Sequence, residues 1–160
     1  MQITELLDPK RVACDADLGS KKRVLELISE LVVKDQPDMA PAEVFDKLVA
    51  RERLGSTALG NGVAIPHARL KNLERPVCAF VKLNDGVDFD AVDNRAVDIL
   101  CALLVPEQSC EEHLDILSTL AEMFSDADFC QRLRSARDAG ELLESISQWQ
   151  STNLQHTATR

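Results

Sequence analysis

The stretch Ile99-Leu100-Cys101-Ala102-Leu103-Leu104-Val105 is apolar at every position and is followed by Pro106. A strand with one face in water alternates apolar and polar residues, whereas a strand covered on both faces is apolar throughout. Residues 99–105 therefore predict the central strand of a sheet with helices packed on both faces. A second strand is predicted over residues 77–83, followed by a turn at 84–86 and a half-exposed edge strand over 87–90.

Two short extended pieces, residues 56–59 and 63–65, surround the triplet Gly60-Asn61-Gly62. Asn and Gly tolerate the positive φ angles of a tight turn, so we expect the chain to reverse direction at this triplet. Pro66 has no amide hydrogen to donate to a sheet. We therefore expect the second piece to end at Pro66 and His67 to lie at a strand end.

Helical segments are predicted on both sides of this strand-rich centre. Apolar residues at helical spacing predict one helix that begins after Ser20 and another that runs from about Pro41 to Gly55. The tetrad Ser109-Cys110-Glu111-Glu112 has the form of a capping box, which predicts that a third helix begins there. Two more helices are predicted, over 129–136 and 141–149. The order of elements predicts an α/β fold, a mixed parallel and antiparallel sheet flanked by helices on both faces.

The chain has 160 residues and a formal net charge of −9. We expect a single domain over residues 1–150 and a disordered tail over 151–160, where the sequence is polar and lacks periodicity. A molecule this acidic is repelled by nucleic acid and by anionic lipid. The longest apolar run is too short to span a bilayer, and residues 1–10 do not form a signal peptide. We therefore expect a cytoplasmic protein without a nucleic-acid partner and without membrane insertion.

The five cysteines include no Cys-x-x-Cys pair, and their scattered spacing is typical of small buried hydrophobic residues. Cys110 and His113 have the spacing of half a metal site, but the sequence offers no second half, so no metal is expected. Neither of the usual glycine-rich phosphate loops is present. The sequence thus predicts no nucleotide or other cofactor.

Two of the three histidines lie where α/β proteins bind ligands. His67 follows a predicted strand, and His113 lies one turn into the helix that follows the most apolar strand. Ligands collect at the carboxyl ends of strands and at helix N-termini, so an anion site near His113 is one interpretation. Taken singly, His113 also fits the edge of the core and His67 also fits an ordinary loop.

A longer run of residues favours a functional site over an ordinary loop or core position for these histidines. It is Arg51-Glu52-Arg53-Leu54-Gly55-Ser56-Thr57-Ala58-Leu59-Gly60-Asn61-Gly62-Val63-Ala64-Ile65-Pro66-His67. It resembles the phosphorylation-site signature of the fructose/mannitol-type IIA components of the bacterial phosphotransferase system. The resemblance extends from about Leu6 to about Gln148, and it is greatest to the nitrogen-regulatory members of that family.

The resemblance implies a phosphotransferase component in which His67 accepts a phosphoryl group from a small HPr-like phosphocarrier protein, with no nucleotide-dependent kinase activity. Arg51 matches the family's active-site arginine, and His113 matches its second histidine. Three further residues are candidate hydrogen-bond donors to the phosphate: Arg53, Ser56 and Thr57.

Three functions remain open at this point. The first is a nitrogen-regulatory phosphohistidine carrier that controls target proteins, whose identity the sequence does not give, through its phosphorylation state. The second is a sugar-transport IIA component that passes phosphate to a IIB domain. The absence of a following IIB or IIC segment favours the first. The third is a non-catalytic metal-binding or interaction module that uses His67, Cys110 and His113.

Overall fold

The computed structural model describes residues 2–108 and 111–158. Within these residues six strands form one sheet, ordered β1-β5-β6-β3-β2, with β4 paired to β6 beyond the end of β3. The strands are β1 (Val12–Ala16), β2 (Ala58–Gly60), β3 (Val63–Ala64), β4 (His67–Leu70), β5 (Val77–Val87) and β6 (Val97–Pro106). The helices are α1 (Ile3–Leu6), α2 (Lys21–Val33), α3 (Pro41–Arg53), α4 (Glu111–Phe124), α5 (Ala127–Ser135) and α6 (Ala139–Ala158), with a short 3-10 helix at Pro9–Arg11.

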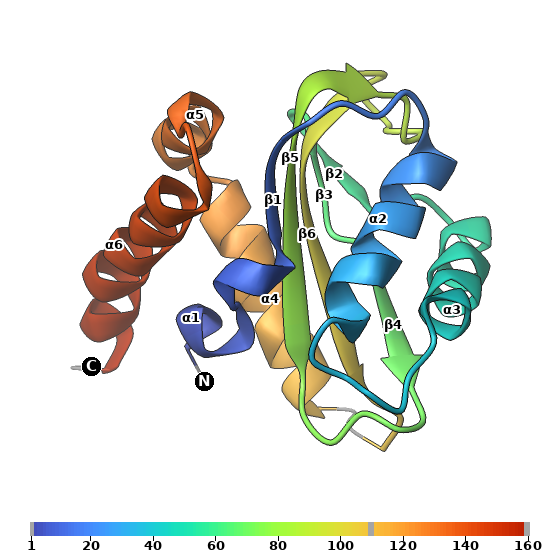
Figure 1. Cartoon of the computed structure of the whole chain (residues 1–160). Helices are drawn as coiled ribbons and strands as arrows, with labels where there is room; N and C mark the ends of the chain where they lie inside the picture. The colour runs from blue at the N-terminus through green and yellow to red at the C-terminus, as the bar shows by residue number, and fades with distance from the viewer. Residues whose placement is uncertain (1, 109–110, 159–160) are drawn as a thin grey trace.

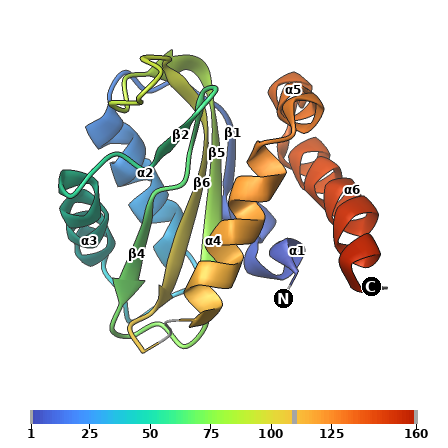
Figure 2. The same cartoon turned by 180° about the vertical axis from the view of Figure 1, so that it is seen from behind.

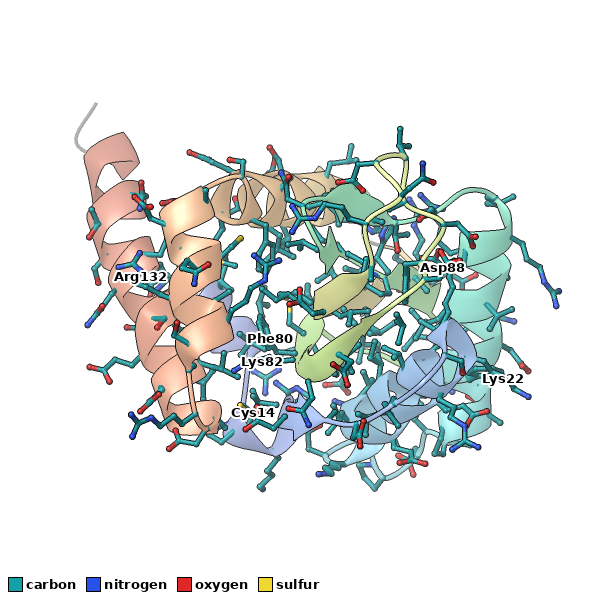
Figure 3. All side chains as sticks on the ribbon, turned by 90° about the horizontal axis from the view of Figure 1, so that it is seen from above. Cys14, Lys22, Phe80, Lys82, Asp88 and Arg132 are labelled. Carbon is teal, nitrogen blue, oxygen red and sulfur yellow. The ribbon has the colours of Figure 1, made fainter. Side chains whose placement is uncertain are left out.

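Helices cover both faces of the sheet, which confirms the predicted fold class. Figure 1 shows α2 and α3 on one face and α1, α4, α5 and α6 on the other. In the view from above, Cys14, Phe80 and Lys82 lie between the sheet and the α5–α6 layer, whereas Lys22 lies on the opposite side (Figure 3). Each layer has its own apolar core against the sheet.

The strand β6 is the centre of the sheet, as its unbroken apolar sequence predicts. It pairs antiparallel with β5 and parallel with β3 and β4. Residues 99–105 are fully buried, with side chains alternating between the two apolar cores. Cys78 and Cys101 are also fully buried in this region, which agrees with their interpretation as small hydrophobic residues.

The predicted turn at residues 84–86 is wrong, because β5 continues through it to Val87. The pairing with β6 is irregular after Lys82 and resumes at Val87, opposite Val97. The turn-forming residues Asn84-Asp85-Gly86 therefore occupy an exposed irregularity within a long strand. The chain reverses direction only after Val87, in the segment that leads to β6.

The expected position of His67 at a strand end also needs correction, because His67 begins a new strand, β4. That strand is short, and its buried Ala68 and Leu70 give too little alternation to predict it from sequence. Pro66 lacks an amide hydrogen but still contributes to the sheet, since its carbonyl accepts a hydrogen bond from the amide of Leu103 at 2.8 Å. The strand β1 was likewise not predicted.

The predicted helices are present. Ser20 caps α2, with its side chain accepting from the amide of Arg23 at 3.2 Å, and α3 begins at Pro41. The capping box expected at 109–112 falls partly outside the described residues. The last helix, α6, continues to Ala158, and the division into a domain and a tail at residue 150 stays a prediction. Among the described residues, no helix is long and apolar enough to cross a membrane.

Because β6 supplies both apolar cores, truncating one of its buried side chains leaves a cavity at the centre of the fold. We expect Leu100→Ala, at a fully buried position, to lower the free energy of unfolding by about 2–5 kcal/mol. Leu114→Ala removes the same atoms from a side chain that is 66% exposed. Urea unfolding of both variants checks the difference, and equal losses would contradict the central role of β6.

Candidate functional site

The fold brings together the two histidines that the sequence singles out. His67 is the first residue of β4, and His113 lies in the first turns of α4. Their ring centroids are 5.5 Å apart, and the ring planes are nearly perpendicular at 81°. Figure 2 shows α4 running along the face of the sheet opposite α2 and α3. The two rings thus meet at the junction between a strand and the helix that follows β6.

The ring of His67 has a defined hydrogen-bond partner. Its Nδ1 lies 2.8 Å from the main-chain carbonyl oxygen of Ile65. A carbonyl oxygen can only accept, so Nδ1 carries the hydrogen and donates it. In the neutral ring the lone pair is then on Nε2. The strand start therefore fixes both the orientation and the tautomer of His67, and the lone pair of the neutral ring is on Nε2.

The surroundings of His67 keep the ring neutral. Burial has the largest effect and lowers the pKa of His67, because an imidazolium is poorly solvated there. The hydrogen bond to Ile65 opposes this change, the positive charge of Arg51 lowers the pKa further, and the negative charge of Glu52 raises it. The net result is a pKa below the ordinary value of 6.5. An uncharged ring with a free nitrogen is the form that acts as a nucleophile.

The ring of His113 is buried, with an exposed fraction of 8%. Among the described residues its Nδ1 has no hydrogen-bond partner. Burial lowers the pKa of His113 most, followed by the charges of His67 and Arg69. An unpaired buried nitrogen costs about 1–3 kcal/mol, so Nδ1 of His113 has a hydrogen-bonding capacity that no described residue uses.

The arginines of the predicted site lie at the end of α3. Arg51 donates from Nη1 to the carbonyl of Gly55 at 2.8 Å, and its charge acts on His67. Arg53 is exposed, and it lines a groove between α2 and α3 together with Lys21 and Lys22. The structure therefore places Arg51 near enough for its charge to act on His67, and it places Arg53 on a different surface.

The hydroxyl groups of the predicted site already have acceptors within the protein. Ser56 donates from Oγ to the carbonyl of Phe89 at 2.6 Å. Thr57 donates from Oγ1 to the carboxylate of Glu52. Both hydroxyls hold the loop after α3 in place. The carboxylate of Glu52 is an element that the sequence did not reveal, because a charge between two arginines at a helix end is typical of a solvated surface.

The turn before β3 is also fixed by a residue that sequence reasoning missed. Asn61 and Gly62 have positive φ angles of 58° and 81°. Arg134 donates from Nη2 to the carbonyl of Asn61 at 2.7 Å, and a Cβ at Gly62 would lie 2.7 Å from that nitrogen. The turn therefore needs glycine here for its backbone angle and for the close approach of the guanidinium. No spacing in the sequence links Arg134, in α5, to this turn.

Among the described residues, no group of three His, Cys, Asp or Glu side chains is arranged to hold a metal ion. Cys110, half of the alternative metal pair with His113, lies outside the described residues.

Because burial and Arg51 both lower the pKa of His67, we expect its ring to titrate below 6.5 in the folded protein. Arg51→Gln removes a nearby cation and raises that pKa. The unfolded chain binds more protons than the folded chain between the two pKa values, so His67 makes stability fall as pH drops below about 6.5. Imidazole NMR titration of both proteins checks this, and a His67 midpoint at or above 6.5 in the unsubstituted protein would contradict it.

Comparisons with known proteins agree with the sequence resemblance. Residues 5–149 match the family model described as "Phosphoenolpyruvate-dependent sugar phosphotransferase system, EIIA 2". The nitrogen regulatory protein of Pseudomonas aeruginosa is 46% identical over 146 residues, which cover 91% of this chain and 95% of that protein. A fructose-specific EIIA component of Haloferax volcanii is 34% identical over 122 residues, covering 74% of this chain and 77% of that protein.

The fold has a solved counterpart in the same family. The crystal structure of nitrogen regulatory protein IIA-Ntr from Neisseria meningitidis superposes with a TM-score of 0.85 at 39% sequence identity, covering 90% of this chain and 98% of that one. The chain therefore belongs to the EIIA 2 family of the phosphoenolpyruvate-dependent sugar phosphotransferase system, and it is a IIA component, a phosphotransferase protein.

Proposed function

We propose that this chain is a phosphohistidine carrier of the nitrogen-regulatory kind. His67 accepts a phosphoryl group from a small histidine-phosphorylated carrier of the HPr kind, and the phosphorylation state of His67 controls which target proteins the chain binds. The observation that carries the proposal is the hydrogen bond from Nδ1 of His67 to Ile65, at 2.8 Å. It leaves the Nε2 lone pair free in a ring whose pKa is lowered.

The transfer forms one phosphorus–nitrogen bond and breaks another. The Nε2 lone pair of His67 attacks the phosphorus of the carrier's phosphohistidine, and the electron pair of the broken bond returns to the carrier's imidazole nitrogen. Both the donor and the product are phosphoramidates of similar energy, so the transfer is reversible. The Nδ1 hydrogen stays on its bond to Ile65 throughout. No nucleotide takes part.

Arg51 and His113 stabilise the moving phosphoryl group. Its transition state is loose, with negative charge spread over the equatorial oxygens, so positioned donors supply most of the catalysis. The guanidinium of Arg51 offers paired hydrogen bonds to phosphate, and the ring of His113 stands against that of His67. Of the other residues that the sequence suggested, Ser56 and Thr57 hold the loop after α3 through their hydroxyls, and Arg53 lines the groove between α2 and α3.

The regulatory part of the proposal rests on similarity and on surface chemistry. The relative with 46% identity is called a nitrogen regulatory protein, while the fructose-specific relative is less similar at 34%. Phosphorylation adds roughly two negative charges at one surface point, which weakens or creates contacts without refolding the domain. Leu114, next in sequence to His113, is 66% exposed and offers apolar contact area for a partner.

Incubation with phosphoenolpyruvate, enzyme I and the HPr-like carrier should add one acid-labile, alkali-stable phosphoryl group to the chain. We expect His67→Ala to abolish the mass gain. Arg51→Ala and His113→Ala should still accept phosphate, about 10²–10³-fold more slowly in single turnover, because each removes one donor to the developing charge. Intact-mass spectrometry measures all four proteins. A full mass gain in His67→Ala would place the nucleophile elsewhere.

The phosphorylated and free forms should recover different partner proteins from an extract. We expect affinities that differ by about 1–3 kcal/mol, the usual size of a coupling energy between two sites. His67→Ala, which stays unphosphorylated, should recover the partners of the free form under both conditions. Identical partners for both forms, together with rapid transfer to a sugar-specific IIB domain, would instead support the sugar-transport function.

A further inference from the structure

We propose that Glu52 is a positioning residue for the phosphoryl acceptor, acting through Thr57 and Ile65 on the ring of His67. The inference rests on the proposed role of His67 and adds to it the group that holds the ring in its reactive form. Glu52 does not touch the phosphoryl group.

The carboxylate of Glu52 is buried at the end of α3, with only 5% of its side chain exposed. Its Oε1 accepts a hydrogen bond from the hydroxyl of Thr57, and its Oε2 accepts a longer one from the amide of Thr57 at 3.4 Å. Its Oε2 also lies 2.8 Å from Nζ of Lys21, in the first turn of α2. One carboxylate thus joins two helices to the loop that precedes β2.

Hydrogen bonds continue from Thr57 to the reactive ring. The carbonyl of Thr57 accepts from the amide of Ile65 at 3.1 Å. The carbonyl of that same Ile65 accepts from Nδ1 of His67 at 2.8 Å. The side chain and amide of Thr57 are therefore held by Glu52, while its carbonyl holds the peptide that orients the ring. The path from Glu52 to His67 consists of consecutive hydrogen bonds through two residues.

Among the described residues, Lys21 and Thr57 are the partners that compensate the burial of the Glu52 carboxylate. A buried carboxylate without partners is strongly destabilising, so its presence requires Lys21 and Thr57 to stay in place. Lys21 is itself held over the ring of Phe89, 4.7 Å from the centroid, and 3.4 Å from the carboxylate of Asp90. The loop is thus fixed from the α2 side of the sheet, whereas His113 reaches His67 from the other side.

Glu52 also acts on the ring through its charge. The negative charge of Glu52 raises the pKa of His67 and opposes the effect of Arg51. Its removal would lower the pKa of His67, which gives a signature that a loss of packing alone would not produce.

Thr57→Val is the most direct test, because it removes the hydroxyl that donates to Glu52 and keeps the main-chain groups of residue 57. We expect the maximal single-turnover rate of phosphoryl transfer from the carrier to fall about tenfold to a hundredfold, as misplacement of a reacting group does. The carrier concentration at half-maximal rate should stay near that of the unsubstituted protein, because Glu52 and Thr57 are buried. Thr57→Ser, which retains the hydroxyl, should restore the rate.

Nitrogen-15 NMR of the unphosphorylated protein supplies a second readout. In the unsubstituted protein the hydrogen of the neutral His67 ring should reside on Nδ1, and in Thr57→Val the share with the hydrogen on Nε2 should rise. Glu52→Gln should lower both the transfer rate and the midpoint of the His67 titration. Glu43→Gln, which neutralises an exposed carboxylate in the first turn of the same helix, is the matched control and should change none of these values.

The outcomes separate this inference from the proposed function. If the unsubstituted protein is phosphorylated on His67 and Thr57→Val keeps its maximal rate and tautomer, Glu52 has a structural role only and the inference is overturned. If the unsubstituted protein takes no phosphate on His67, the proposed function fails and the role of Glu52 in transfer fails with it. If Glu52→Gln does not fold, the rate and tautomer of Thr57→Val decide.

Discussion

The pairing of β6 with its neighbours is the constraint on which the site depends. Leu103 of β6 donates its amide to the carbonyl of Pro66 at 2.8 Å and stands opposite His67 in the parallel ladder. His113 is set by the same strand in another way, since α4 follows β6 along the chain. One buried strand thus positions His67 by hydrogen bonding and His113 by chain continuity. Its unbroken apolar sequence serves this geometry as well as stability.

The two faces of the sheet contribute different residues to the site. On the α2–α3 side, the end of α3 supplies Arg51 and the buried carboxylate of Glu52, which holds the loop that follows. On the other side, α4 supplies His113, and Arg134 of α5 holds the turn at Asn61. The site lies between these layers, at the start of β4 beside β6. A sugar-transport component would use the same arrangement, so similarity to nitrogen regulatory proteins, and not the geometry, is what favours regulation.

Much of the fold could be predicted from the sequence because its strongest signals are local. The apolar run at 99–105, the cap at Ser20 and the proline at residue 41 each identify an element through their own chemistry. The strands β1 and β4 could not be predicted, because they are short and are defined by their pairing with strands distant in sequence. The turn predicted at Asn84-Asp85-Gly86 was wrong because turn-forming residues are also found in an irregular part of a strand.

For the site, the run from Arg51 to His67 identified residues through resemblance. The structure places the ring of His113 against that of His67, and it places Arg51 where its charge acts on His67. The burial of the Glu52 side chain and the hydrogen bond from Arg134 to Asn61 depend on tertiary contacts, which the spacing of residues in the sequence does not reveal. The acceptor of the His67 hydrogen bond is a main-chain carbonyl, which every amino acid at position 65 would carry. No substitution of residue 65 can delete that acceptor; substitutions can only displace it. The tautomer of the His67 ring therefore depends on the backbone and not on the identity of residue 65. Substitutions around the site can change the pKa of the ring while Nδ1 keeps its hydrogen-bond acceptor.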